Sequence, residues 1–271
     1  MSIMRSVGVE ISHGFGDCLF SIPLLRAISV KYNTKIGVAT KASNRDAFIN
    51  IPFIDHIVPI NNFYDGEKVL IDLEYQKFIQ ITPNHYFQKF KDADPNHSLI
   101  DTIKTIGDEI ACPITDQRPV FIPTTHEFNK CAAFDFGMDD YIAIESEYLS
   151  GQSWATSEHI NRIVEKYEKT HKIIWLSNTQ PPDSPAICDM SDWSRRELIL
   201  MLNYVDKFFS VGSGFFCASL ALSVSRKINT VCLWIDDYYR YIGRIKELGW
   251  NDNITWLLNP QELDDYLATA V

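Results

Sequence analysis

The chain alternates short apolar runs with longer segments in which apolar residues recur every three or four positions. Short apolar runs bounded by turn residues are typical of buried strands, and the longer spacing is typical of helices with one buried face. Strands that alternate with helices favour a parallel, doubly wound sheet. In the first half we predict strands at 6–12, 35–39, 54–60, 69–73 and 78–81, and helices at 43–50 and 97–110.

The first predicted helix follows a glycine turn. The strand at 6–12 ends in the turn 14–16, and Asp17 comes directly after it. Proline has no backbone N–H and breaks a helix that is already running. We therefore predict that Pro23 lies at the start of the main helix. Residues 14–21 then form a separate, tighter turn that carries Asp17.

The second half repeats the same rhythm after a segment without it. Residues 112–136 contain three prolines and no clear period, so we interpret them as the connection between two domains, 1–135 and 136–271. Ser194 with Glu197 three residues later is a capping box that predicts a helix start. In this half we predict strands at 141–145, 172–176, 186–190, 207–211, 230–235 and 254–258, and helices at 156–170, 194–204, 215–224, 238–248 and from 260 onward.

Composition and charge narrow the classes of protein. The chain has 271 residues and a formal net charge of −10, with about −3 in residues 1–135 and −7 in the rest. This acidity disfavours a large nucleic-acid footprint, which needs a positive face. There is no long apolar run and no signal-peptide pattern, so we expect a cytoplasmic protein without a membrane span. The six scattered cysteines are typical of reduced thiols, and neither they nor the seven histidines have the spacing of a metal site, so we expect none.

Asp17 is the first candidate for chemistry. The glycines of the turn 14–16 allow a ligand to approach the backbone closely, and an exposed carboxylate there is suited to act as a general base on a hydroxyl. The alternative is an ordinary helix start, where backbone N–H groups favour an acidic residue. On the functional interpretation His13, Gly14 and Gly16 line the acceptor side, together with His85 and Tyr86 at the end of a later strand.

A second turn, residues 210–215, joins a predicted strand to a predicted helix. Small residues at such a junction leave N–H groups free for a diphosphate at the helix N-terminus, which assigns Ser213, Gly214 and Phe215 to that role. The alternative is a plain strand–helix turn, because neither the lysine of a P-loop nor a full dinucleotide fingerprint is present.

Two further loops of the second half contain candidate donor-binding residues. Trp193 can stack on a nucleobase, with Asn178 beside the nucleotide, or it is a hydrophobic staple before its helix. Gln152 and Ser153 can donate to a phosphate oxygen, or they belong to a surface loop in which Trp154 packs.

The order of these motifs resembles that of a known family. Gly16-Asp17, the helix segment 22–27 and the segment 50–55 are similar to the N-terminal pattern of the heptosyltransferase-like glycosyltransferases of the ADP-heptose:lipopolysaccharide type. In the second half, residues 195–198 and 211–214 are similar to their sugar-nucleotide half.

The resemblance implies an α/β GT-B fold, with two Rossmann-like, doubly wound domains that face each other across a cleft. It implies that the first domain binds the acceptor and the second the nucleotide sugar, and that transfer is metal-independent and inverting. Asp17 matches the family's base, Trp193 the residue against the nucleobase, and Ser213 and Gly214 the diphosphate turn.

The chain departs from the family pattern in the second half. Gly212 and Cys217 replace an aspartate and a histidine of the usual turn, and Gln152-Ser153 stands where a lysine precedes the tryptophan. A Ser-Gly turn resembles that of the bacterial protein-modifying heptosyltransferases.

We therefore predict a glycosyltransferase that moves a sugar from a nucleotide-diphosphate donor to a hydroxyl of a glycan, lipid or nucleic acid. The nucleotide sugar is a co-substrate, and no further cofactor is expected. One alternative is a transferase that acts on modified bases of viral DNA. An alternative of another class is a non-catalytic protein that binds sugar nucleotides or serves as a scaffold.

Overall fold

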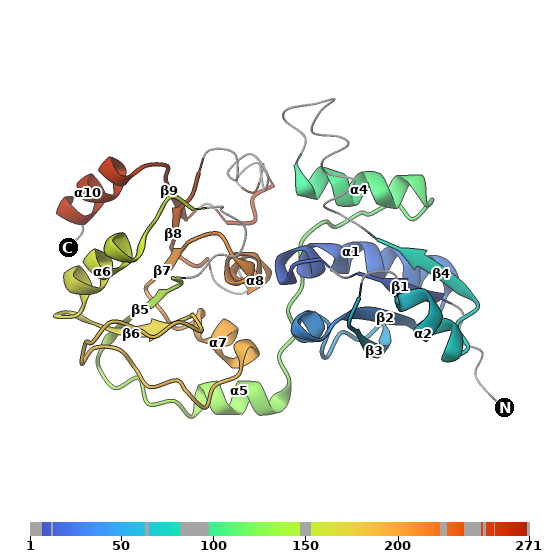
Figure 1. The fold of residues 1–271 in the computed structure, drawn as a ribbon, viewed down its shortest axis with the longest axis horizontal. Coiled ribbons are helices and arrows are strands. Elements are labelled where there is room, and N and C mark those ends of the chain that lie inside the picture. The colour runs from blue at the N-terminus through green and yellow to red at the C-terminus, as the bar shows by residue number, and fades with distance from the viewer. Residues whose placement is uncertain are drawn as a thin grey trace. The chain divides into compact units, whose positions relative to one another are not determined.

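The computed structural model describes residues 7–11, 13–62, 65–81, 98–146, 153–222, 227–235, 245, 248–251 and 253–269. These residues form two compact units, of which the first extends to Ile122 and the second begins at Pro123. Each unit has its own sheet, and both sheets are entirely parallel (Figure 1). The alternation of strands and helices in the sequence therefore predicts the class of fold correctly.

The first unit is a four-stranded sheet in the order β3-β2-β1-β4. Helices α1 and α4 pack together on one face, and α2 packs on the other (Figure 1). The elements are β1 (Val7–Glu10), α1 (Phe15–Tyr32), β2 (Ile36–Lys41), the 3-10 helix η1 (Ala42–Ala47), β3 (Ile54–Ile60), α2 (Gly66–Asp72), β4 (Lys77–Gln80) and α4 (Leu99–Glu109).

The strand predicted at 69–73 is wrong, because this segment lies in helix α2. A short apolar run does not distinguish a strand from a buried helix turn. The space available on the face of the sheet favours the helix. A Cβ atom on Gly8 of β1 would lie 2.9 Å from Leu70 Cδ1, and one on Gly37 of β2 would overlap the Tyr75 ring. The missing side chains thus let the helix and its following turn lie close to the sheet.

Helix α1 is continuous from Phe15 to Tyr32, so the predicted separate turn before Pro23 is also wrong. Gly14 is the N-cap, and Asp17 is the third residue of the helix. A proline inside a helix costs about 3 kcal/mol. Every residue from 18 to 25 is buried, and each large apolar side chain among them contributes about 1.5–3 kcal/mol on burial. The burial of this helix outweighs the lost hydrogen bond.

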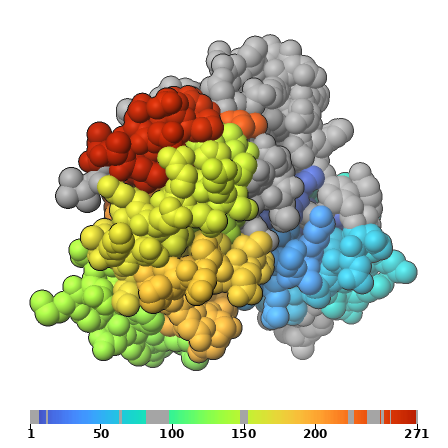
Figure 2. Space-filling view, turned by 60° about the vertical axis from the view of Figure 1, so that its left-hand side comes forward, coloured from blue at the N-terminus to red at the C-terminus, as the bar shows by residue number. Residues whose placement is uncertain are grey.

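The second unit is a five-stranded sheet in the order β6-β5-β7-β8-β9. Helices α6 and α10 lie on one side of it and α7 and α8 on the other (Figure 1), and Figure 2 shows α10, in red, beside the yellow-green α6. The elements are α5 (Thr125–Ala132), β5 (Asp140–Ile144), α6 (Ser157–Tyr167), β6 (His171–Trp175), α7 (Arg195–Met201), β7 (Lys207–Ser210), α8 (Gly214–Leu222), β8 (Thr230–Leu233), β9 (Ile254–Leu257) and α10 (Pro260–Thr269).

Two predicted elements of this unit have other outcomes. The segment 186–190 makes a single parallel bridge, Ile187 to Ile173, instead of a strand. The helix predicted at 238–248 falls almost wholly outside the described residues.

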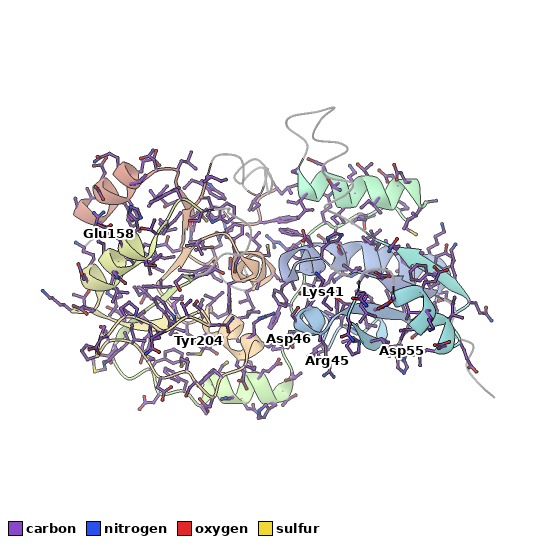
Figure 3. All side chains as sticks on the ribbon, viewed as in Figure 1. Lys41, Arg45, Asp46, Asp55, Glu158 and Tyr204 are labelled. Carbon is purple, nitrogen blue, oxygen red and sulfur yellow. The ribbon has the colours of Figure 1, made fainter. Side chains whose placement is uncertain are left out.

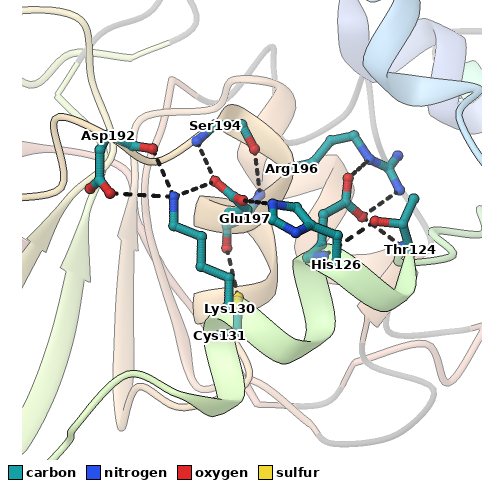
Figure 4. A network of polar contacts seen from close by, with 9 residues as sticks. Thr124, His126, Lys130, Cys131, Asp192, Ser194, Arg196 and Glu197 are labelled. Atoms are coloured by element: carbon teal, nitrogen blue, oxygen red, sulfur yellow. Dashed lines mark hydrogen bonds and ion pairs between the residues drawn. The ribbon is translucent and has the colours of Figure 1, made fainter.

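Helix α5 lies inside the segment that the sequence indicated as irregular, and it packs on α7. It begins with a capping box of its own, in which the Thr124 hydroxyl and the Glu127 carboxylate each accept a backbone N–H. The buried Arg196 guanidinium then binds Glu127 through two hydrogen bonds of 2.6 and 3.1 Å (Figure 4). Such a short helix gives a weak periodic signal, and this buried ion pair is what fixes it in place.

A second ionic contact joins the same two helices. The Lys130 ammonium of α5 donates to the Glu197 carboxylate at 3.1 Å and to the Asp192 carbonyl at 2.7 Å (Figure 4). Glu197 is also the acid of the predicted capping box, which the structure confirms, since it accepts the Ser194 N–H at 2.7 Å. None of the described helices is long and apolar enough to cross a membrane.

Candidate active-site elements of the two units

In an open parallel sheet, ligands bind beyond the carboxyl ends of the strands. In the first unit this edge contains the turn from β1 into α1. In the second unit it contains the loops after β5 and β6 and the turn from β7 into α8. The predicted site residues that the structure describes lie in or beside these connections.

Asp17 holds the turn at the carboxyl edge of the first sheet. Its Oδ2 atom accepts the Gly14 N–H at 3.1 Å, which is the bond of a helix N-terminus. The alternative interpretation of this acid, a helix start, is therefore structurally correct. It does not exclude a role in catalysis, because Asp17 is only half-buried and Gly14 is exposed.

Contacts on the buried side of the turn hold the residues next to Asp17 in place. The buried Asn44 side chain donates to the His13 carbonyl, which anchors the turn to η1. Burial and the adjacent Asp17 carboxylate raise the pKa of the Cys18 thiol far above its ordinary value. Cys18 is therefore a neutral core residue and no nucleophile.

A fully buried acid, Glu10, ends strand β1 at the same edge. It lies against the first residue of α2, since a Cβ atom on Gly66 would be 2.6 Å from Glu10 Oε2. The absence of a side chain at Gly66 thus lets α2 begin directly beside Glu10.

Glu145 has the equivalent position in the second unit, directly after strand β5. Its side chain is buried, and residues of the predicted diphosphate turn surround its carboxyl group. The donors to that group are the Ser210 hydroxyl at 2.8 Å, the Val211 N–H at 3.2 Å, the Ser213 N–H at 3.4 Å and the Ser213 hydroxyl. An internal carboxyl group thus occupies hydrogen-bond donors that the sequence assigned to a diphosphate.

Burial dominates the electrostatics of Glu145. Removal of the carboxyl group from water raises its pKa from 4.5 to about 8, although the hydrogen bonds from Ser210 and the turn act in the opposite direction. Burial therefore favours the neutral acid over the carboxylate.

Neither Glu10 nor Glu145 belongs to the motifs singled out in the sequence. The signal that points to both is the same: an apolar strand, V-G-V or I-A-I, followed at once by glutamate. A charged residue that closes a buried parallel strand lies at the ligand-binding edge.

Ser153 is used inside the protein, which corrects its assignment to the phosphate. Its hydroxyl donates to the Leu233 carbonyl and accepts the Ala155 N–H at 3.0 Å, so its proton is not available to a phosphate oxygen. The adjacent Trp154 donates its indole N–H to the Leu257 carbonyl at 2.8 Å. These contacts tie the loop before α6 to β8 and β9, as the alternative of a packing loop predicts.

Trp193 packs on the connection between α5 and β5. Its ring meets the edge of Phe134 at a centroid distance of 5.6 Å, and the Lys130 ammonium lies 4.8 Å from its centroid. The half-buried indole therefore packs within the second unit, with the Lys130 cation over its ring.

Asn178 is exposed in the loop after β6. Three hydroxyl groups order this loop: Thr179 Oγ1 lies 3.0 Å from Ser146 Oγ and 2.9 Å from Ser177 Oγ. The loop is thus fixed at the carboxyl edge of β5 and β6, next to the position of Glu145.

The remaining predicted residues Gln152, His85 and Tyr86 lie outside the described residues. Within the described ranges, no group of three or more histidine, cysteine or acidic side chains is arranged to hold a metal ion.

A cavity of about 560 Å³ lies beside η1 and β3 of the first unit. Arg45 and Asp55, labelled in Figure 3, line it together with the segment 48–52 that precedes β3. The segment 50–55, which carries part of the family resemblance, therefore contributes to the lining of this cavity.

Comparison with known proteins gives structural neighbours only. No protein family and no curated protein matches the sequence. A glycosyl transferase of family 9 from Veillonella parvula has a similar structure, with a TM-score of 0.64 and 10% identity over 98% of this chain and 90% of that one.

Two Escherichia coli enzymes have comparable similarity. ADP-heptose lps heptosyltransferase II has a TM-score of 0.61 and 12% identity over 96% of this chain and 94% of its own. Heptosyltransferase WaaC, solved with ADP, has a TM-score of 0.62 and 10% identity over 95% and 94%. The resemblance seen in the sequence agrees with these neighbours in fold. The chain has the GT-B fold of such glycosyltransferases, built from two Rossmann-like units that each contain a parallel sheet.

Proposed function

We propose that the protein is a glycosyltransferase that moves a sugar from a nucleotide-diphosphate donor to an acceptor hydroxyl. The observation that supports this most strongly is the similarity of fold to glycosyltransferases over nearly the whole chain. The position of Asp17 and of the turn before α8, each at the carboxyl edge of its own sheet, is consistent with it.

In this proposal the second unit binds the donor at the turn from β7 into α8. The Gly214 N–H has no acceptor among the described residues and begins a nine-residue helix, which favours an anion there. The same group stabilises the negative charge that develops on the departing nucleoside diphosphate. The nucleoside extends toward the loop of Asn178.

The first unit supplies the base. The Asp17 carboxylate takes the proton of the acceptor hydroxyl as its oxygen attacks the anomeric carbon from the face opposite the diphosphate. The result is inversion, and the leaving group needs no metal when backbone N–H groups neutralise it. A general base of this kind accelerates a reaction by roughly 10²–10⁴-fold.

The test compares Asp17→Asn with a matched control. Asp101 is also the third residue of a helix in the first unit, and its carboxylate accepts the Ser98 N–H of its N-cap at 3.2 Å. We expect Asp17→Asn to lower transfer at least about 100-fold with nucleotide affinity nearly unchanged. Asp101→Asn should keep transfer and lose only stability.

The donor is found first, by thermal shift against a panel of ADP-, UDP- and GDP-linked sugars, because a selective ligand raises the melting temperature by mass action. Full activity of Asp17→Asn would exclude its role as base. Selective binding without any transfer or donor hydrolysis would favour the alternative of a non-catalytic sugar-nucleotide-binding protein.

A further inference from the structure

Glu145 is placed where its charge matters for the donor proposed above. The carboxyl group is in contact with Ser213, the residue directly before the first residue of α8. An anion on the Gly214 N–H would therefore lie next to this group, whose own side chain is buried. Two negative charges at such a separation repel each other strongly in a medium of low dielectric constant.

A change in the direction of one hydrogen bond avoids this repulsion. Glu145 Oε1 and Ser213 Oγ are within hydrogen-bond contact, and a hydroxyl group both donates and accepts. When Glu145 is ionised, Ser213 must donate its proton to the carboxylate. When Glu145 carries a proton, the carboxylic acid donates to Ser213 Oγ, and the Ser213 proton becomes available to another acceptor.

We propose that Glu145 is a positioning residue that binds the donor diphosphate only indirectly: as a neutral acid it donates to Ser213, which then directs its own hydroxyl proton at a phosphate oxygen. This inference rests on the proposed function, because it assigns the ligand of the turn. Its consequence is that diphosphate binding and proton binding are coupled, with one proton taken up from solvent by each ionised Glu145 that receives a ligand.

The surroundings of Glu145 support a proton in this position. No ion pair of Glu145 with a cation is found in the part of the chain that the structure describes. The titratable group that reaches it from β8 is the buried Cys232 thiol, whose pKa is raised well above its ordinary value, so this neighbour is neutral. The other groups around it are the hydroxyls and N–H groups of the turn from Ser210 to Phe215.

The experiment measures the affinity for a nucleotide sugar as a function of pH by calorimetry. The probe is whichever of ADP-glucose, UDP-glucose, GDP-mannose and ADP-heptose binds most tightly, since a diphosphate diester keeps its charge across the range. From about 1.5 pH units below to about 1.5 units above the pKa of Glu145, we expect the affinity to fall at least about tenfold. Calorimetry in buffers of different ionisation enthalpy should show proton uptake at the upper pH.

Two variants separate coupling from a merely structural role. Glu145→Gln has an amide that donates to Ser213 at every pH, so it should keep the low-pH affinity and lose the pH dependence and the proton uptake. Glu158→Gln, an exposed change on α6 (Figure 3), is the control and should behave as the wild type. Ser213→Ala should weaken binding at low pH, because the directed hydroxyl is lost.

Each failure has its own meaning. Equal affinity at both pH values in the wild type, or the same pH dependence in Glu145→Gln, overturns the inference and leaves the proposed function standing. Failure of every nucleotide sugar to bind overturns both.

Discussion

Glu145 also predicts how the stability of the second unit depends on pH. In the unfolded chain this carboxyl group has its ordinary pKa of 4.5, and in the folded protein burial raises it to about 8. Between these values the folded state binds more protons than the unfolded state. The free energy of unfolding therefore falls as the pH rises through this window, and the contribution of the neutral acid is lost above the folded pKa.

The magnitude follows from the shift. One pKa unit corresponds to about 1.4 kcal/mol, so the shift of Glu145 gives at most about 5 kcal/mol across the window, or about 1.4 kcal/mol for each pH unit. The lowered pKa values of Glu127 and Glu197 act below pH 4.5, outside the window, because paired carboxylates lose their stabilisation only when they become protonated.

The assay is urea unfolding of the wild type and of Glu145→Gln at several pH values across the window. All six tryptophans lie in the second unit, so their fluorescence reports its unfolding separately from that of the first. Glutamine does not titrate, and other groups cancel in the comparison. We expect the difference in unfolding free energy between the two proteins to change with pH in favour of the wild type at the acidic end. A difference that stays constant would refute this assignment of the pKa.

Three further predictions concern packing and reactivity. Glu127→Ala removes the carboxylate that binds the buried Arg196 guanidinium and should destabilise the second unit by about 3–5 kcal/mol in the same urea assay. Replacement of both residues by methionine should recover most of the loss, and equal losses in the single and double variants would contradict this. Gly37→Ala places a methyl group in the Tyr75 ring, so it should lower the free energy of unfolding by about 1–3 kcal/mol, measured by circular dichroism. Adding Tyr75→Ala should relieve the overlap. A neutral effect of Gly37→Ala would mean that the ring is free to move. Cys188 is the one cysteine that is not buried, so a thiol reagent should label it first and give a fast phase of labelling. Cys188→Ser should remove this phase. A fast phase that persists would place an accessible thiol elsewhere.

Local patterning was sufficient for the parallel sheets. Strands such as β5 and β8 are mostly apolar segments between turn residues, and their neighbours in the sequence supply the crossover helices. The capping box of Ser194 and Glu197 was predictable for the same reason, because all its atoms lie within one turn.

The errors occur where distant residues decide the conformation. Helix α2 depends on the space that Gly8 and Gly37 leave on the sheet, and α5 depends on a buried arginine about 70 positions along the chain. Ser153 and Trp154 look like ligand-binding residues in a loop, but the carbonyl groups of β8 and β9 use their donors.

In the candidate site, too, the locally determined features were predictable and those that depend on distant residues were not. The turns of Asp17 and Ser213 were recognised from local spacing, since small residues at the end of a strand need no distant partner to be seen. The acid that occupies the second turn was missed, because Glu145 and Ser213 are far apart in sequence and meet only when β5 and β7 pair.

Pro23 removes one hydrogen bond from helix α1 near the end that carries Asp17. Because Pro23 has no N–H to offer the Leu19 carbonyl, the turns that precede it are joined to the remainder by one hydrogen bond fewer. The residues that precede Pro23, such as Leu19 and Ile22, are fully buried, so opening of the first turns would expose apolar side chains to water. Packing in the core therefore takes the place of the missing hydrogen bond and holds the turn that carries Asp17 in position.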